Sequence, residues 1–403
     1  MSHKPFFSVL IPTKGRPQYL KEALLSVLLQ NMEDYEVIVS DNNTDNDSSK
    51  EIKNLISNPK VKYIKTPKLL SMPDNWEFGS KHAAGKYLMV LPDRKVLYSG
   101  ALKHLKKQLI KFNEPDSCSF AVKTYDDHNK RMAWFPDHIK TGKTFLIKPD
   151  KLISNFLSED MWGNKSMDFF FPKTLNGCVK LSLIEQARKK TGKFFNNTFA
   201  TTPDYSSCFT QLALAKTILH VGKPTYLAQG ESASNGRASG NVDCTPYLNS
   251  LGFDDYYHYV PLKTPLIFNL LYNDFLCVRH LFGERLLNHH PDWANYFATI
   301  YSELEWLKKD NYRTKESIEK DENGLFEELK KHNKQVADKF EKLKVAVQKK
   351  YQPAKAGSKI KNLKLHVRDY INHNYSRFTV VNSIMKHRFD SALEAAGHKK
   401  ISH

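Results

Sequence analysis

Residues Gly85–Leu97 read GKYLMVLPDRKVL. An uninterrupted apolar run within Lys86–Leu91 is followed directly by Pro92–Lys95, which holds one acid and two bases. A short continuous apolar run is typical of a strand that is covered on both faces. The charged side chains of Asp93, Arg94 and Lys95 therefore stand where a buried strand reaches the surface, and they mark a candidate binding site.

Other segments repeat this pattern and predict a parallel sheet. Phe6–Pro12, Tyr35–Ser40 and Val61–Lys65 are further buried strands. Helical spacing of leucine and valine predicts a helix over Pro17–Gln30, and another is expected over Trp76–Ala84. Alternating strands and helices favour a parallel sheet with right-handed crossovers. Ligands of such sheets bind beyond the carboxyl ends of the strands.

Three short segments occupy those carboxyl ends: Thr13–Arg16, Asp41–Thr44 and Asp93–Lys95. The first of them, within PTKGRP, is neither GxGxxG nor GxxxxGK[ST]. These are the glycine-rich loops that hold phosphates in Rossmann dehydrogenases and P-loop ATPases. The sequence therefore argues against both classes.

The C-terminal part has a different character. Residues 230–245 are rich in Gly, Ser and Asn and predict a loop, so we divide the chain into 1–245 and 246–403. Helices are expected over Leu262–Phe282, Trp293–Leu307 and Lys315–Lys350. An apolar stripe along the last of these favours core packing or a helical hairpin over a membrane anchor.

Charge is concentrated near the C-terminus. The 403 residues carry a net charge of +18, and residues 331–403 contribute +12 of it, with 17 Lys and Arg against 5 Asp and Glu. A basic region of this kind suits an anionic membrane surface, a nucleic acid or an acidic polymer. The alternative is a solvated basic helical surface.

Cysteine usage and hydropathy indicate the compartment. The five cysteines are scattered, odd in number and without CxxC spacing, which argues against a disulfide framework and a zinc site and suits a reducing cytosol. No apolar run approaches the roughly 18–20 residues of a membrane span, and the apolar part of the N-terminus is too short for a signal peptide. We expect a cytoplasmic protein, soluble or attached to a membrane surface.

Four segments together resemble the family 2 glycosyltransferases, which have the GT-A fold. They are FSVLIPTKGRPQYLKEALLSVLLQ, YEVIVSDNNTDND, AAGKYLMVLPDRKVL and PDYSSCFTQLALAKTILHVGKPTYLA, in family order over about residues 6–230. The resemblance implies a mostly parallel α/β sheet flanked by helices, here followed by a helical C-terminal region. It also implies a nucleotide-sugar donor, and we expect a UDP-linked one.

The resemblance assigns donor-binding roles to residues at the strand ends. Asp41 matches the acid that accepts a hydrogen bond from the nucleotide base, although it could be an ordinary turn residue. Thr13 and Arg16 match the loop that wraps the nucleotide, although Arg16 could face solvent. Asn75 lies where family members place a polar donor contact, and a plain helix cap at Asp74 or Asn75 is the alternative.

The triplet Asp93-Arg94-Lys95 occupies the family's metal-binding position, where DDD or DxD is usual. Asp93 keeps the first acid, but the two bases would repel Mg²⁺ or Mn²⁺ rather than bind it. Arg94 can bind a phosphate bidentately and Lys95 can act as a point charge. We expect weakened or absent metal dependence; the alternative is a metal held by Asp93 and the pyrophosphate.

The catalytic base of the family sits in an ED-like motif that heads a helix. Here TTPDYSSCFTQL matches it, with Asp204 as the base and Pro203 where Glu is usual. Asp204 could instead be an ordinary acid at a helix N-terminus. Glu159-Asp160, a literal ED pair, is the rival position.

These observations lead to an inverting glycosyltransferase that acts on a glycan or a lipid-linked glycan, in polysaccharide or cell-surface glycan synthesis, as a peripheral protein of the cytoplasmic membrane face. Two other classes stay open. One is a non-catalytic binding protein on a decayed GT-A scaffold, suggested by the lost acids in DRK and PD. The other is a nucleic-acid-binding protein, disfavoured because no RRM or helix-turn-helix signature is present.

Overall fold

The computed structural model describes residues 4–42, 48–126, 131–132, 142–158, 170–195, 200–229, 245–252, 255–309, 313–351 and 391–398. Three features of the sequence lie outside the described residues. They are the rival pair Glu159-Asp160, nearly all of the 230–245 loop, and the basic stretch 352–390.

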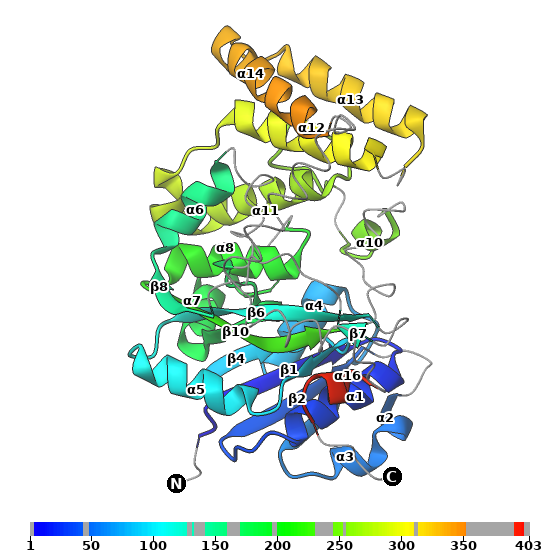
Figure 1. The fold of residues 1–403 in the computed structure, drawn as a ribbon, viewed down its shortest axis with the longest axis vertical. Helices are drawn as coiled ribbons and strands as arrows, with labels where there is room; N and C mark the ends of the chain where they lie inside the picture. Colours follow the sequence, from blue (N-terminus) through cyan, green and yellow to red (C-terminus); the bar gives the residue numbers. More distant parts are fainter. Residues whose placement is uncertain are drawn as a thin grey trace, which may run out of the picture.

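A ten-stranded mixed sheet forms the centre of the N-terminal part (Figure 1). Its order is β3-β2-β1-β4-β9-β6-β10-β5, with β7 added to β6 and β8 added to β10. The strands are β1 (Phe7–Thr13), β2 (Tyr35–Asp41), β3 (Val61–Lys65), β4 (Tyr87–Val90), β5 (Lys95–Leu97), β6 (Ser117–Asp126), β7 (Arg131–Met132), β8 (Thr144–Ile147), β9 (Gly177–Lys180) and β10 (Ile218–Ala228).

The first four strands confirm the predicted parallel sheet. β1 pairs in parallel with β2 and with β4, and β2 pairs in parallel with β3. Beyond β4 the sheet is mixed, because β9 runs antiparallel to both β4 and β6, whereas β10 is parallel to β6. The last element of the opening segment, β5, runs antiparallel to β10, so the chain turns at Pro92 and re-enters the sheet at Lys95.

Helices cover both faces of the sheet, as the buried apolar runs require. Val9 and Ile11 point to one face, where they pack with α1 and α5, whereas Leu10 points to the opposite face, against α4 and α8. The helices of this part are α1 (Pro17–Leu28), α2 (Ser48–Glu51), α3 (Lys53–Ile56), α4 (Met72–Ser80), α5 (Ala101–Lys111), α6 (Pro149–Leu157), α7 (Leu181–Thr191) and α8 (Pro203–Leu214). The predicted α/β architecture is therefore confirmed.

One predicted helix begins four residues earlier than expected. The segment predicted as Trp76–Ala84 is α4, which starts at Met72 because Ser71 is its N-cap and accepts a hydrogen bond from the backbone N–H of Asp74. The alternative that Asp74 or Asn75 caps this helix is therefore wrong. Gly79 allows α4 to lie close to the sheet, because a Cβ there would meet Leu10 Cδ1 at 2.5 Å.

The C-terminal part is helical, as predicted, and extends away from the sheet (Figure 1). Its elements are α10 (Thr245–Asn249), α11 (Ile267–Phe282), the 3-10 turn η6 (Glu284–Asn288), α12 (Trp293–Lys309), α13 (Lys315–Leu329) and α14 (Lys334–Tyr351). The single helix expected over 315–350 is in fact two helices, broken between Leu329 and Lys334. Their apolar stripe packs in the core with α12, in agreement with the predicted helical hairpin.

One hydrophobic cluster extends from the sheet through α8 and α11 to the helical hairpin, from Leu10 to Phe340. The division at residue 245 stays a prediction, since this packing is continuous across it. Among the helices that the structure describes, none combines the length and the apolar character needed to cross a bilayer.

The end of the chain returns to the sheet beside the opening segment. The short helix α16 (Ala392–Ala395) lies next to α1 in Figure 1, and Ala392 and Ala396 pack on Val96. The backbone N–H of Ser99 donates to the carbonyl of Ala396, and His398 Nε2 donates to the carbonyl of Leu97 at 2.8 Å. Segments that are far apart in the sequence therefore support one another at β5.

This packing predicts the effect of shortening the chain. A protein ending at residue 390 loses the apolar cover over β5 and both hydrogen bonds, which together contribute about 1–3 kcal/mol. Its melting temperature should fall by several degrees in calorimetry. A protein ending at residue 398 is the control and should have the melting temperature of the full chain. Equal melting temperatures for the proteins ending at 390, at 398 and at 403 would show that this contact does not stabilise the fold.

Candidate functional site

The carboxyl ends of β1, β2 and β4 meet at one edge of the sheet, and the predicted donor-binding residues gather there. Thr13 is the register partner of Asp41 across β1 and β2. Thr13 Oγ1 also donates a hydrogen bond to Asp93 Oδ2, at 2.9 Å. The structure therefore brings together Thr13, Asp41 and Asp93, one residue from each strand-end segment that the sequence identified. Residues 43 and 44 of the second segment lie outside the described residues.

Asp93 is a buried acid that the loop after β1 holds in place. Its side chain is only 1% exposed, and Arg16 Nε lies 3.1 Å from Oδ2. Burial raises the pKa of Asp93, while Arg16, the hydroxyl of Thr13 and Arg94 oppose that rise. Gly15 makes the turn between Thr13 and Arg16 with a φ of 65°, a conformation that side chains with a Cβ rarely adopt.

Asp41 keeps one carboxylate oxygen for a further partner. The hydroxyl of Tyr63 donates to Asp41 Oδ2 at 2.6 Å. Oδ1 is buried and accepts no hydrogen bond from the residues that the structure describes. A buried carboxylate oxygen without a donor is unfavourable by itself, so this position suits a ligand N–H.

Lys95 points inward from the start of β5. It is 8% exposed, and its Nζ donates to the carbonyl of Leu175 at 2.9 Å. Burial, together with Lys173 and Arg94, lowers the pKa of Lys95 to about 7, and Asp204 opposes this. Arg94 Nη1 donates to the carbonyl of Gln229 at 3.2 Å.

Asp204 lies in the first turn of α8, near enough to Lys95 for the two charges to interact. Burial raises the pKa of Asp204, whereas Lys173, the backbone N–H groups of Asp204 and Tyr205, and Lys95 oppose the rise. The predicted base and the predicted cations therefore belong to one electrostatic site, although they lie far apart in the sequence.

Lys173 is a site residue that sequence reasoning missed. It is buried and lies over the ring of Tyr205, with Nζ 4.9 Å from the ring centroid and 3.4 Å from the hydroxyl. Lys173 stands in the irregular stretch FFPKTLNG, which carries no motif. Only the packing of this stretch against α8 places its charge beside Asp204.

The side chains around Asp93 do not provide the oxygen ligands that a protein-held divalent cation needs. Asp93 is one carboxylate with Arg16 beside it and two further cations next in sequence, whereas Mg²⁺ and Mn²⁺ require several oxygen ligands. Across the described ranges, no group of three or more His, Cys, Asp or Glu is arranged to hold a metal ion.

Asn75 has its partner within the fold. It is buried, and Oδ1 accepts a hydrogen bond from Ser40 Oγ at 2.7 Å. This contact joins α4 to β2 directly before Asp41. A donor contact from Asn75 stays a prediction.

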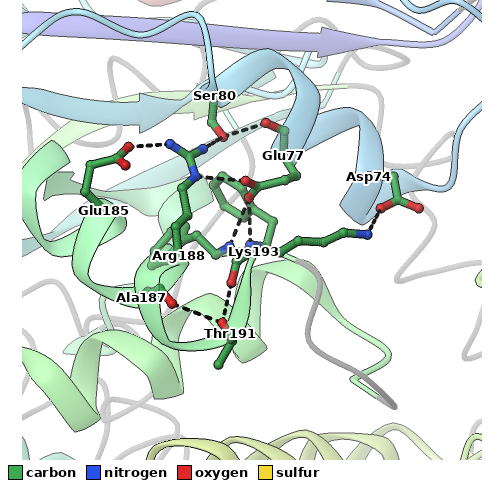
Figure 2. Close-up of polar contacts among 10 residues, drawn as sticks. Asp74, Glu77, Ser80, Glu185, Ala187, Arg188, Thr191 and Lys193 are labelled. Carbon is green, nitrogen blue, oxygen red and sulfur yellow. Dashed lines mark hydrogen bonds and ion pairs between the residues drawn. The ribbon is translucent and has the colours of Figure 1, made fainter.

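A buried ion pair anchors the segment that leads toward Asp204 (Figure 2). Arg188 Nε lies 2.8 Å from Glu77 Oε1, and Arg188 also donates to Ser80 Oγ at 2.6 Å. The other oxygen of Glu77 accepts the backbone N–H groups of Phe194 and Phe195 at 3.0 and 3.2 Å. Figure 2 also shows the more exposed pair of Lys193 and Asp74.

Part of the chain is similar to known proteins. Residues 8–171 match the family described as glycosyl transferase family 2. Over 106 residues, 26% of the chain, the protein is 33% identical to the GalNAc(5)-diNAcBac-PP-undecaprenol beta-1,3-glucosyltransferase of Campylobacter jejuni. The chain spans only about a third, 34%, of the length of that curated relative.

Two solved structures of TarS from S. aureus are similar at low sequence identity. TarS 1-349 in complex with UDP-GlcNAc is 14% identical with a TM-score of 0.48, and the match covers 87% of this chain and 93% of that one. TarS itself is 13% identical with a TM-score of 0.43, and the match covers 87% and 56% of the two chains.

The ion pair of Figure 2 gives a testable prediction about stability. Arg188→Met leaves the buried carboxylate of Glu77 without its charged partner, and breaking such a pair costs about 3–5 kcal/mol. Lys193→Met removes the exposed pair with Asp74 and should cost less than about 1 kcal/mol. Urea unfolding of both variants measures the difference. Equal losses would contradict the assigned role of Glu77.

Proposed function

Because residues 8–171 match the glycosyl transferase family 2 model, we propose that the protein transfers a sugar from a nucleotide-sugar donor to a hydroxyl of a glycan acceptor. The observation that carries this proposal is the meeting of two groups at one edge of the sheet. The strand ends supply Asp41, Asp93 and Lys95, and α8 supplies Asp204. No such arrangement is needed for packing alone.

The nucleotide would bind at the ends of β1 and β2. Oδ1 of Asp41, which has no donor among the described residues, would accept the N–H of a base. Uracil offers one at its N3, so a UDP-linked donor fits this position, as a dTDP- or GDP-linked one also would. Thr13 and Arg16 would line the nucleotide on the side of β1. Arg16 is about one third exposed, so its guanidinium can reach a phosphate while it stays near Asp93.

Asp204 would act as the general base in an inverting displacement. Its carboxylate takes the proton of the acceptor hydroxyl while that oxygen forms a bond to the anomeric carbon. The bond from that carbon to the diphosphate oxygen breaks, and its electron pair leaves with the nucleoside diphosphate. Burial raises the pKa of Asp204, which makes its carboxylate a stronger base.

The leaving diphosphate would be stabilised by side chains rather than by a protein-held metal. Arg94, Lys95 and Lys173 would supply the positive charge, and burial together with Lys173 and Arg94 lowers the pKa of Lys95. Cations already in place beside the leaving diphosphate oxygen stabilise the negative charge that develops there, and no side chain has to move during the reaction. This supports weakened or absent dependence on Mg²⁺ or Mn²⁺.

The acceptor would be a glycan, and a lipid-linked one is supported by the Campylobacter jejuni relative, whose name describes a glycan on undecaprenol diphosphate. A cytoplasmic protein docked on the membrane face would meet such an acceptor. The net charge of +12 in residues 331–403 would favour an anionic lipid surface, at about 1 kcal/mol per nearby basic residue. Nucleic acid is not part of this proposal.

A nucleotide panel tests the donor and the metal together. We expect one of UDP, GDP, CMP and dTDP to raise the melting temperature, because a ligand at 100 times its Kd stabilises by about 2.7 kcal/mol. The shift should survive EDTA. The protein should then release UDP from the matching UDP-sugar, and Asp204→Asn should lower that rate by at least about 100-fold with unchanged nucleotide affinity.

Each part of the panel has its own contrary result. A shift seen only with Mn²⁺ would reject the replacement of the metal and keep the transferase. No shift with any nucleotide would favour a non-catalytic protein on this scaffold. Asp41→Asn is the control for base recognition and should weaken the response to the preferred nucleotide selectively.

The pKa of Lys95 predicts how donor affinity changes with pH. Burial lowers this pKa to about 7, so Lys95 is charged at lower pH and neutral at higher pH. The diphosphate of a UDP-sugar does not titrate in this range. The affinity for a UDP-sugar should therefore fall between about pH 6 and about pH 8.5. The fall should be on the order of tenfold, because one unit of pKa corresponds to about 1.36 kcal/mol. Isothermal titration at several pH values measures it.

Two variants identify the titrating group. Lys95→Met should bind weakly and with little pH dependence. Asp204→Asn removes the acid whose charge acts on Lys95, and it should keep the slope of the wild type if Lys95 is the titrating group. A slope that disappears in Asp204→Asn would assign the pH dependence to Asp204 and reject Lys95 as its source.

A further inference from the structure

The helix that carries Asp204 is held at both ends by side chains of the C-terminal helical part. α8 begins at Pro203, so Asp204 lies in its first turn and moves with it. α11 packs along α8 in the shared hydrophobic cluster (Figure 1). The position of the proposed base therefore depends on contacts made after residue 245.

Asp274 of α11 makes the contacts at the N-terminus of α8. Its side chain is fully buried, and Oδ1 accepts hydrogen bonds from Thr201 N at 2.6 Å and from Thr201 Oγ1 at 3.0 Å. Oδ2 accepts hydrogen bonds from Thr202 N at 2.8 Å and from Thr202 Oγ1. Thr202 is the N-cap residue of α8, two positions before Asp204.

These four hydrogen bonds hold the backbone directly before Asp204 in place. All four are N–H or O–H groups that donate to one carboxylate. An asparagine at this position could not accept all four hydrogen bonds, because its NH₂ group only donates. The hydroxyl of Tyr247 donates to the carbonyl of Thr201 at 2.6 Å from a third direction. The backbone N–H, the hydroxyl and the carbonyl of Thr201 therefore all have hydrogen-bond partners in the region after residue 245.

Arg285 of η6 makes the matching contact at the C-terminus of α8. Arg285 Nη1 donates to the carbonyls of Leu212 and Ala215, at 2.8 and 2.6 Å. A carboxylate at the N-terminus and a guanidinium at the C-terminus each suit the helix dipole. The two side chains together restrain α8 along its axis.

We propose that Asp274 is a positioning residue for Asp204, so that the catalytic unit includes α11. This inference rests on the proposed function. Asp274 does not touch the proposed donor or acceptor; it holds Thr201 and Thr202, and through them the first turn of α8. A catalytic group displaced by about 1 Å can lose about 100-fold in rate.

Glu303 supplies a matched control within the same region. It is a buried carboxylate that accepts two successive backbone N–H groups, from Ile267 and Phe268, at 2.7 and 2.9 Å. It therefore holds the N-terminus of α11 as Asp274 holds that of α8. These bonds lie in the first turn of α11, about two turns before Asp274, so the removal of Glu303 should cost stability and leave the hydrogen bonds of Asp274 in place.

The experiment compares Asp274→Asn with Glu303→Gln in the full chain. Melting temperature, UDP affinity by titration, and kcat and KM for UDP release from the UDP-sugar are measured at a temperature where both variants are folded. We expect both to melt below the wild type. Only Asp274→Asn should lower kcat, by about 10- to 100-fold, with unchanged affinity for UDP.

A milder variant covers the case in which Asp274→Asn does not fold. Thr201→Val removes one hydroxyl donor to Asp274 and preserves the shape of the side chain, and it should lower kcat several-fold with normal UDP affinity. The inference would be overturned if Asp274→Asn kept the kcat of the wild type, or if Thr201→Val did so when it alone folds. An equal loss of kcat in Glu303→Gln would also overturn it. Absence of UDP release by the wild type would instead reject the proposed function, and the positioning role with it.

Discussion

The buried carboxylate of Asp93 is the constraint around which the site is arranged. An ionised acid that is 1% exposed is stable only when donors and cations surround it. Thr13 at the end of β1 and Arg16 in the loop after it meet this need, and Arg94 contributes from the position next to Asp93. The same contacts bring the ends of β1 and β4 together, so satisfying one charge builds one wall of the candidate site.

The cations near Asp93 and Asp204 give this site its distinct character. Lys95 and Lys173 are both buried, and desolvation, followed by the repulsion from Lys173, lowers the pKa of Lys95. Such an arrangement is unfavourable for the protein alone. A bound diphosphate would relieve it, because two negative phosphates would lie where the protein concentrates positive charge. The electrostatic cost in the free protein is thus an argument for the anionic ligand.

Buried carboxylates that accept pairs of successive backbone N–H groups recur in this fold. Glu77 holds Phe194 and Phe195, Asp274 holds Thr201 and Thr202, and Glu303 holds the start of α11. Each joins segments far apart in the sequence. Two of them anchor the described backbone that precedes Asp204. The proposed base is therefore located by ion pairs and hydrogen bonds as well as by apolar packing.

The sequence by itself determined the parallel half of the sheet and the strand-end residues. Continuous apolar runs bounded by Pro, Gly and Asp specify buried strands locally, and the bounds predicted for β3 match the observed ones. Parallel strands place their carboxyl ends at one edge, so the strand pattern alone was enough to expect Asp41 and Asp93 together. The break between α13 and α14 was missed because apolar spacing continues through it.

Only the tertiary structure decided the rest of the site. Lys173 lies in a stretch without periodicity, and its charge acts on Asp204 because that stretch packs on α8. Asp274 lies in a predicted helix, where a lone acid resembles any solvated residue. Its four hydrogen bonds exist because α11 packs against α8, a long-range contact that no local pattern encodes. Local periodicity specifies elements, whereas the partners of buried charges are specified by which elements meet.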